Sequence, residues 1–312
     1  MRSYTVVGLG AIGGYYGARL QQAGHPVRFL ARSDADHLRR HGLRVDSPEG
    51  DARLAVDVFH DPAEVPPSDT VIVATKTTGN APVTAVVRRL VGGSDTVSSV
   101  LVMQNGLGVE ATFAAVVPDA PVLGAMCFMC CNKVGPGHIE HLDYGAVTVG
   151  QHTADGRPAG VTAAVEAIVA DLQGAAVAAT PVADLETGRW QKLVWNMAFN
   201  GLSVVDDALT DRLVSDPAIR ARAVTIMHEV VVAAAACGHP FEVDFVDRML
   251  ANTEAMAPYR PSMKLDHDAG RPLELDAIYA VPIAAARAAG SPMIECEALL
   301  AQLRRLDPPP AD

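Results

Sequence analysis

The stretch Gly8-Leu9-Gly10-Ala11-Ile12-Gly13 (GLGAIG) lies close to the start of the chain and determines which fold is predicted for its first half. A short apolar run, residues 4–7, precedes it and predicts a strand. Residues 12–23 predict a helix that ends before Gly24. A G-x-G-x-x-G turn between a strand and a helix is typical of a dinucleotide-binding unit.

Each glycine of this turn has a distinct physical role in such a unit. Gly8 permits the tight turn, Gly10 lets the backbone approach a pyrophosphate, and Gly13 lets the helix pack closely on the strand. The amino end of the helix then faces the anion. The alternative is that the glycines serve only a tight connection between strand and helix.

The second predicted strand, residues 27–30, ends close to Arg32. A site for NAD places an acidic residue at this tip to bind the ribose 2′-hydroxyl, whereas a guanidinium suits a 2′-phosphate. We therefore expect NADP(H) as the cofactor. The alternative is that Arg32 is a solvated surface residue and that Asp34 reaches the ribose.

The first half of the chain alternates short β-branched runs with helical stretches, which predicts βαβ units in a doubly wound, Rossmann-type parallel sheet. After the turn at 135–137, we expect two strands, 137–142 and 146–150, at an antiparallel edge. From residue 184 onward the pattern is almost entirely helical. The fold class is therefore α/β, with an NADP-binding Rossmann-type domain over 1–183 and an all-α substrate and catalytic domain over 184–312.

Composition excludes several classes of protein. With 312 residues the chain is long enough for two domains, and a net charge of −11 without a basic stripe argues against nucleic acid as a partner. Five cysteines without regular spacing predict reduced thiols, and therefore a cytoplasmic protein without a signal peptide. The most apolar window, 221–236, contains charged residues and predicts a buried helix rather than a membrane span. The apolar helical half could equally bury a homodimer interface.

Two further residues follow apolar strands of the predicted sheet. Lys76 ends the run 71–76, and Asn105 follows the run 100–103. Ligands of open α/β sheets lie at the carboxyl ends of the strands, so both side chains are candidates for cofactor or substrate contacts. The alternatives are a solvated lysine and an ordinary Asn-Gly turn.

The stretch 189–200, RWQKLVWNMAFN, carries a polar ladder along a predicted helix over 184–205. Lys192, Asn196 and Asn200 are spaced by four residues, a step that rises about 6 Å and keeps the side chains on one side. Asparagine is unfavourable within a helix, and such departures are expected at functional sites. The alternative is a ladder that faces solvent.

Later in the chain, Ser262 lies in PSMKLD and Glu274 in GRPLELD. Pro272 fits the first turn of a predicted helix over 273–289, and Glu274 would favour its dipole. A group of three cysteines lacks the spacing of a zinc site and is interpreted as packing residues, so that we expect no metal; the group comprises Cys127, Cys130 and Cys131.

Taken together, these stretches resemble the ketopantoate reductase (2-dehydropantoate 2-reductase) family of the 6-phosphogluconate dehydrogenase-like superfamily, in matching order over nearly the whole chain. The resemblance implies that Lys192 is the general acid and that Asn196 and Asn200 bind substrate. It further implies a substrate contact for Ser262, a cofactor or catalytic role for Glu274, and contacts of Asn105 with both ligands. Arg32 and Lys76 would bind the cofactor.

The chain departs from the family pattern at three places. Gly79 replaces a frequent glutamine, Pro261 replaces a frequent serine, and Thr210 lies near the position of a further substrate-side asparagine. The resemblance implies an NADPH-dependent reductase of a 2-oxo acid, foremost 2-dehydropantoate, whose site would lie between the two domains. The alternatives are a reductase of another 2-oxo acid or an imine, and a non-catalytic NADPH-binding sensor.

Overall fold

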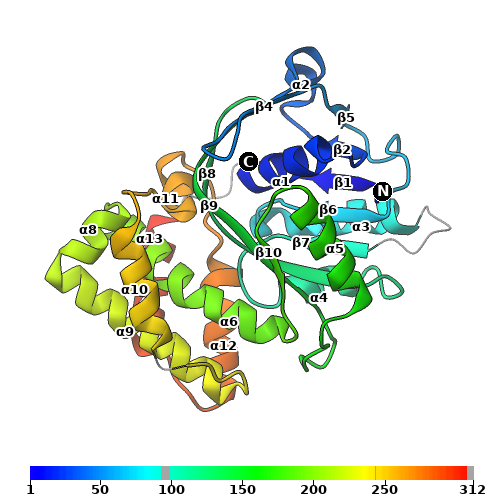
Figure 1. Cartoon of the computed structure of the whole chain (residues 1–312). Helices are drawn as coiled ribbons and strands as arrows, with labels where there is room; N and C mark the ends of the chain where they lie inside the picture. The colour runs from blue at the N-terminus through cyan, green and yellow to red at the C-terminus, as the bar shows by residue number, and fades with distance from the viewer. Residues whose placement is uncertain (93–98, 243, 308–312) are drawn as a thin grey trace. The chain divides into compact units, whose positions relative to one another are not determined.

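The computed structural model describes residues 1–92, 99–242 and 244–307 (Figure 1). The chain divides into two compact units. The sheet unit contains Met1–Gln104 and Val109–Leu185, and the helical unit contains Asn105–Gly108 and Glu186–Asp312. The short excursion at 105–108 carries a candidate site residue, Asn105, into the helical unit. The sequence pattern did not predict this excursion.

The sheet unit is built on parallel strands at its centre, in the order β8-β7-β6-β1-β2-β5. β1, β6 and β7 are buried at every residue, as expected of apolar strands covered on both faces. The six strands are β1 (Tyr4–Val7), β2 (Val27–Leu30), β5 (Asp57–Phe59), β6 (Thr70–Val73), β7 (Ser99–Val102) and β8 (Val122–Gly135).

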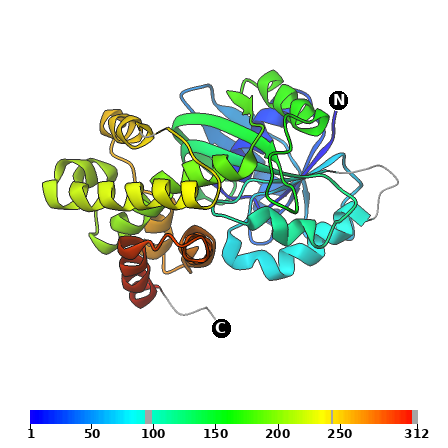
Figure 2. The same cartoon turned by 90° about the horizontal axis from the view of Figure 1, so that it is seen from below.

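Helices cover both faces of this sheet (Figure 2). α1 (Ala11–Gln22) contacts α5 (Ala163–Gly174) on one face, and α3 (Asn80–Gly92) contacts α4 (Val109–Ala114) on the other. The chain leaves β1 toward β2 in one direction, and β6 lies on the opposite side of β1. This reversal creates a switch point at the carboxyl end of β1, where open α/β sheets bind their ligands.

The predicted pair of short strands after residue 136 is wrong. A single strand, β9 (His138–Gln151), runs antiparallel to β8, which continues to Gly135 instead of ending near residue 128. Register shifts between Phe128 and Met129, and again between Cys130 and Cys131, leave Gly145 and Leu142 of β9 without a partner residue and interrupt the alternation along β9. A β-bulge breaks the period of two without ending the strand, so the pattern looks like separate strands.

Three short strands complete the sheet at β9: β3 and β4 extend it beyond that strand, and β10 pairs with β9 separately. β3 (Leu43–Asp46) runs parallel to β9, β4 (Ala52–Leu54) pairs with β3, and β10 (Ala179–Pro181) runs parallel to β9. β3 and β4 were not predicted from the sequence, because each has only three or four residues and no long apolar alternation.

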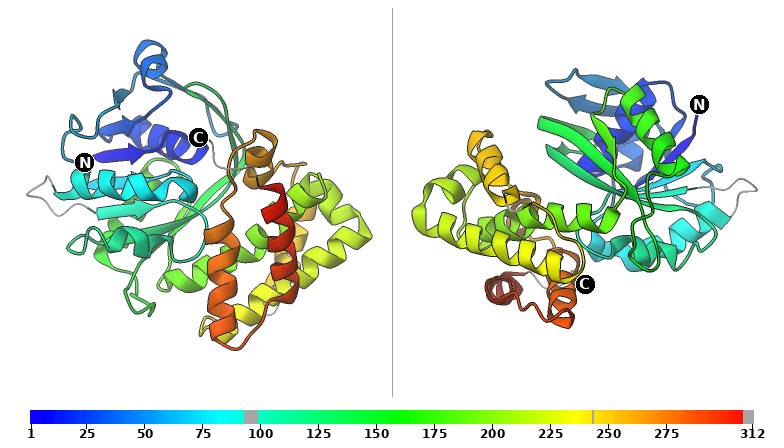
Figure 3. Two further views of the ribbon diagram at one scale, coloured as in Figure 1. Left: turned by 180° about the vertical axis from the view of Figure 1, so that it is seen from behind. Right: turned by 60° about the horizontal axis from the view of Figure 1, so that its bottom comes forward.

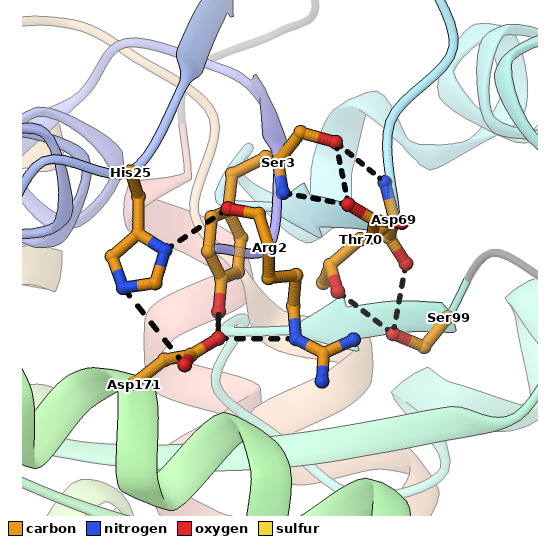
Figure 4. A network of polar contacts seen from close by, with 8 residues as sticks. Arg2, Ser3, His25, Asp69, Thr70, Ser99 and Asp171 are labelled. Carbon is orange, nitrogen blue, oxygen red and sulfur yellow. Dashed lines mark hydrogen bonds and ion pairs between the residues drawn. The ribbon is translucent and has the colours of Figure 1, made fainter.

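Polar contacts fasten the amino-terminal edge of the sheet (Figure 4). Asp171 of α5 accepts hydrogen bonds from Tyr4 Oη at 2.6 Å and Arg2 Nε at 3.0 Å. Asp69 accepts two from Ser3, its backbone N and its Oγ, both at 2.7 Å. These contacts lie at the opposite ends of the strands from the glycine turn; those of Asp171 join the start of β1 to α5, and those of Asp69 join it to the start of β6.

The helical unit begins with α6 (Leu185–Trp195), which continues through a π-helical turn, η2 (Asn196–Asn200), into α7 (Gly201–Val205). A second π-turn, η3 (Asp276–Ala280), precedes α12 (Val281–Ala288). Pro272 lies before this helix rather than in its first turn. The other helices are α8 (Thr210–Ser215), α9 (Pro217–Ala236), α10 (Phe245–Ala255), α11 (Ser262–Asp268) and α13 (Ile294–Leu306).

Helix caps explain where two of these helices begin. Asp216 accepts hydrogen bonds from Ala218 N and Ile219 N and caps α9. Glu229 of α9 accepts hydrogen bonds from the first amides of α13, and α13 lies against α9 (Figure 3). The helix predicted over 243–256 appears as α10; residue 243 itself lies outside the described residues.

The predicted fold class is confirmed. A Rossmann-type α/β sheet is followed by an almost entirely helical region. Among the described residues, no helix is long and apolar enough to cross a membrane.

Candidate active site

The glycine turn has the geometry of a phosphate cradle. Gly8 has a φ of +99°, and a Cβ there would lie 2.7 Å from Thr75 Cγ2. A Cβ at Gly13 would lie 2.2 Å from the Gly8 carbonyl oxygen, whereas a Cβ at Gly10 would meet nothing within 4 Å. Packing therefore requires glycine at 8 and 13, while Gly10 opens onto space at the amino end of α1. This arrangement fits a dinucleotide pyrophosphate.

Neighbouring strand ends surround this turn. The Gly8 amide donates to the Leu30 carbonyl at 3.3 Å, which joins the turn to the end of β2. Cys131 Sγ of β8 lies 3.8 Å from the carbonyl oxygen of Ala11, the first residue of α1. Lys76 is exposed and directly follows Thr75, the residue that packs on Gly8. The glycine turn and the β6 end that carries Lys76 are thus brought together.

Arg32 is exposed beyond β2, and Asp34 is buried. Asp34 Oδ1 accepts from Ser33 Oγ at 3.0 Å, and its Oδ2 accepts from Gly137 N at 3.0 Å and pairs with Lys133 Nζ at 2.6 Å. Burial alone would raise the pKa of Asp34, but the hydrogen bonds from these partners outweigh it and lower that pKa. Both carboxylate oxygens are thus engaged within the protein, which argues against Asp34 as the ribose ligand.

A pair of amides joins the ends of β6 and β7, and the sequence analysis missed it. Gln104 Nε2 donates to Asn80 Oδ1 at 2.6 Å and to the Thr75 carbonyl oxygen at 3.0 Å. Asn80 Nδ2 donates back to Gln104 Oε1 at 3.3 Å. The pair fixes the loop that contains Lys76. The sequence offers one signal for this pair: Gln104 directly precedes the candidate Asn105, and Asn80 directly follows Gly79, which replaces a frequent glutamine of the family.

The polar ladder lies on α6 and η2. Lys192 is partly exposed, whereas Asn196 and Asn200 are only 2% and 1% exposed. Within the described part of the chain, the buried atoms Asn196 Nδ2 and Asn200 Oδ1 have no hydrogen-bond partner. The ladder therefore does not face solvent. A buried amide atom without a partner is costly, and a bound polar ligand would satisfy it.

The π-turn changes the geometry that the sequence spacing predicted. In a continuous α-helix a four-residue step overshoots one turn by about 40°, so Lys192 and Asn200 would drift apart by about 80°. A π-turn closes its hydrogen bond one residue later and has more residues per turn, which offsets this drift. The wide turn needs outside partners, and Tyr279 Oη of η3 donates to the Met197 carbonyl at 2.8 Å.

Asn105 and Glu274 lie near the second π-turn of the helical unit. The Leu107 amide donates to the Ala277 carbonyl oxygen at 2.9 Å, and a Cβ at Gly106 would lie 2.5 Å from Ala277 Cβ. Glu274 is buried, 5% exposed, and precedes η3. η3 in turn contacts η2. The helical unit thus gathers Asn105, Glu274 and the two ladder asparagines around the two π-turns.

Ser262 is the first residue of α11, which contacts both η2 and α7. The buried Lys264 anchors this helix, because its Nζ pairs with Asp207 Oδ1 at 2.8 Å and also contacts Asp268. Burial acts to lower the pKa of Lys264, but the hydrogen bonds to Asp207 and Asp268 prevail and raise it. Lys264 was not singled out in the sequence.

Other sequence candidates have structural partners. Thr210 is fully buried, and its Oγ1 accepts from the Tyr259 amide at 2.9 Å, which is a structural contact. The five cysteines are thiols, and burial raises the pKa of Cys131 to about 12. Among the described residues, no group of three His, Cys, Asp or Glu side chains could hold a metal ion.

Comparisons with known proteins agree over nearly the whole chain. The family model for ketopantoate reductase PanE/ApbA matches residues 4–154, and the model for its C-terminal domain matches residues 184–307. The chain is 42% identical to a curated 2-dehydropantoate 2-reductase from Nostoc sp., over 98% of this chain and 95% of that protein.

Solved structures show the same likeness. A 2-dehydropantoate 2-reductase from Geobacter metallireducens has a TM-score of 0.91 and 35% identity, covering 97% of this chain and 99% of its own. A D-mandelate dehydrogenase solved with NADH and anilino(oxo)acetate has a TM-score of 0.83 at 20% identity, covering 97% of this chain and 98% of its own, and shares the fold.

Proposed function

The chain belongs to the ketopantoate reductase family, and we propose that it reduces 2-dehydropantoate to pantoate with NADPH. The family models and the relative at 42% identity support this activity. The observation that carries it is the pair of buried amides below Lys192, whose unpaired atoms offer one donor, at Asn196, and one acceptor, at Asn200. A small polar substrate with hydroxyl, ketone and carboxylate oxygens suits such a pair.

The cofactor side of the reaction uses the sheet unit. The residues of the glycine turn, Gly8 to Gly13, would cradle the pyrophosphate at the amino end of α1. Arg32 would bind the 2′-phosphate, for which a guanidinium is well suited, and Lys76 would add positive charge near the phosphates or the substrate. The fold alone does not select the cofactor, because a D-mandelate dehydrogenase of the same fold was solved with NADH.

Lys192 would act as the proton donor of the reaction. The bound cofactor supplies a hydride to the keto carbon of the substrate. Negative charge then develops on the ketone oxygen, where the ammonium of Lys192 would stabilise it and donate a proton from Nζ. The product hydroxyl carries that proton, and the neutral amine regains one from solvent.

Four further residues would orient the reacting groups. Asn196 and Asn200 would hold the substrate oxygens in a reactive pose, and Ser262 would donate a hydrogen bond to the carboxylate. Asn105 would contact cofactor and substrate, and Glu274 would orient Lys192 or a cofactor hydroxyl.

An NADPH-oxidation assay with purified protein tests the proposal. We expect turnover with 2-dehydropantoate to exceed that with other 2-oxo acids, and Lys192→Ala to lower kcat by about 10²- to 10⁴-fold. NADPH binding, measured by fluorescence, should survive in that variant. A Lys192→Ala enzyme with normal turnover would refute the role of Lys192. Preference for another 2-oxo acid or an imine would refute the substrate, and NADPH binding without turnover on any of them would indicate a sensor.

Three further predictions from the sequence concern location and partners. The substrate is a small molecule. We predict a cytoplasmic location from the cysteine usage. We also predict that nucleic acid is not a partner and that the chain forms a homodimer. Cell fractionation tests the first, a binding assay with DNA and RNA the second, and sedimentation equilibrium the third.

A further inference from the structure

The ion pair of Lys133 and Asp34 lies beside the residue expected to bind the 2′-phosphate. Lys133, near the end of β8, places its Nζ 2.6 Å from Asp34 Oδ2. Its side chain is 31% exposed, whereas that of Asp34 is 8% exposed. Asp34 follows Arg32 by two residues, after the end of β2. The pair therefore belongs to the part of the sheet unit whose residues distinguish proteins that bind NADPH from proteins that bind NADH.

The side chain of Asp34 is held by the β8–β9 turn rather than by the helix that it precedes. Asp34 precedes the first residue of α2 (Ala35–His41), yet its side chain makes no cap hydrogen bond to that helix. Instead it accepts the amide of Gly137, at the turn between β8 and β9. Gly137 has a φ of +59°, and a Cβ there would lie 3.0 Å from Leu38 Cδ2 of α2. The carboxylate is thus fastened to the β8–β9 turn, and that turn is packed against α2.

A carboxylate at this place has the wrong charge for a 2′-phosphate. An acidic residue near the tip of the second strand is the feature that binds the ribose hydroxyls of NADH, and it repels the phosphate of NADPH. Here the positive charge of Lys133 compensates the carboxylate, and hydrogen bonds occupy both of its oxygens.

We propose that Lys133 is a positioning residue for cofactor choice: it neutralises Asp34 and holds it away from the ribose, so that Arg32 can select the 2′-phosphate. The inference rests on the proposed NADPH dependence and deepens it. Neither the glycine turn nor Arg32 neutralises the negative charge of Asp34, and Lys133 on β8 does so. Without Lys133, the same carboxylate would carry an uncompensated negative charge that opposes the 2′-phosphate of NADPH and leaves NADH unopposed.

A double-variant binding experiment tests this role. Dissociation constants for NADPH, NADH, adenosine 2′-monophosphate and adenosine 5′-monophosphate are measured by calorimetry on the full chain. We expect Lys133→Met to weaken both 2′-phosphate ligands by about tenfold and to leave NADH and the 5′-monophosphate unchanged or tighter. Adding Asp34→Asn to that variant should restore binding of the 2′-phosphate ligands to within about twofold, because the repelling charge is gone.

Controls separate this role from simpler ones. Lys133→Arg should retain the preference, and Arg157→Met, which removes an exposed cation elsewhere in the sheet unit, should change nothing. Equal weakening of all four ligands by Lys133→Met would show a purely structural role and overturn the proposal. A double variant as weak as Lys133→Met would show that Lys133 touches the phosphate itself, which also overturns it. Since the readout is binding of nucleotides, failure of catalysis leaves the test intact.

Discussion

The polar network at the amino-terminal ends of the sheet strands is partly buried and the two asparagines of the ladder on α6 and η2 are deeply buried, and the two regions differ in how far their hydrogen bonds are satisfied. At the sheet edge, Asp171 and Asp69 receive hydrogen bonds from Tyr4, Arg2 and Ser3 (Figure 4). In the ladder, the buried Asn196 Nδ2 and Asn200 Oδ1 lack partners among the residues that the structure describes. A satisfied network stabilises the fold, whereas the unsatisfied atoms of the ladder are ones that the proposed substrate would satisfy.

The largest expected effect comes from the ladder. Asn196→Ala and Asn200→Ala should each lower kcat/KM for the 2-oxo acid on the order of 100-fold, because a substrate contact in the transition state is lost. The free energy of unfolding should change by less than about 1 kcal/mol, since alanine favours the helix and one atom of each removed amide was unsatisfied. Steady-state kinetics and urea unfolding measure both quantities.

The control for the ladder is Asn252→Ala, an exposed asparagine of α10. It should leave the activity unchanged and raise the free energy of unfolding by no more than about 0.5 kcal/mol. A large loss of stability without a loss of kcat/KM in the Asn196 or Asn200 variants would mean that these amides serve the fold.

The second effect reverses the pattern at the sheet edge. Asp171→Ala leaves the hydroxyl of Tyr4, a residue only 1% exposed, without its acceptor. We expect the free energy of unfolding to fall by about 2 kcal/mol, with kcat/KM unchanged at temperatures where the variant is folded. Asp119→Ala, at an exposed position, is the matched control. Loss of NADPH binding by a fully folded Asp171→Ala protein would contradict the comparison.

A smaller effect is expected where stability and site meet. Tyr279→Phe removes the hydroxyl that satisfies the Met197 carbonyl of η2. The free energy of unfolding should fall by about 1–2 kcal/mol, and KM for the 2-oxo acid should rise more than kcat falls, because the ladder loses its alignment. Kinetics and thermal unfolding check this. The exposed Tyr144 provides the control variant, Tyr144→Phe, and an unchanged KM would show that η2 keeps its shape alone.

The smallest effect is a pH dependence at the sheet edge. Hydrogen bonds from the Ser3 backbone and side chain lower the pKa of Asp69 below its ordinary value of 3.8. A lowered pKa in the folded state contributes stability above the ordinary value, and that contribution is lost as the pH falls through the folded value. Asp69→Asn should therefore be less stable than the parent by about 1 kcal/mol at pH 6, with a smaller difference near pH 3. A difference independent of pH in urea unfolding would rule out this ionic contribution.

Local rules in the sequence predicted a large part of the fold. The glycine turn, the apolar strands β1, β2, β6 and β7, and helices such as α9 follow from short patterns, and the structure has them at nearly the predicted residues. Bulges hid the full length of β8 and β9, because they interrupt the alternation on which strand prediction depends. The two π-turns escaped for a related reason, since apolar spacing does not distinguish a π-turn from the α-helix that contains it.

The candidate site divides in the same way. The types and spacing of Lys192, Asn196 and Asn200 by themselves indicate a polar ladder, and the roles of these residues remain predictions. The burial that leaves two amide atoms unpaired, and the hydroxyl of Tyr279 that shapes the turn, depend on residues far along the chain.

By itself, the sequence determined the glycine turn, the helical half and the residues that carry charge. Only the tertiary structure decided which charged side chains are paired within the protein and which are available to a ligand. Asp34 reads as a possible ribose ligand from its place after β2, but Lys133 and Gly137, distant in sequence, occupy its oxygens. Backbone conformation follows from neighbouring residues, whereas the partner of a buried charge is whatever the folded chain brings within hydrogen-bond distance.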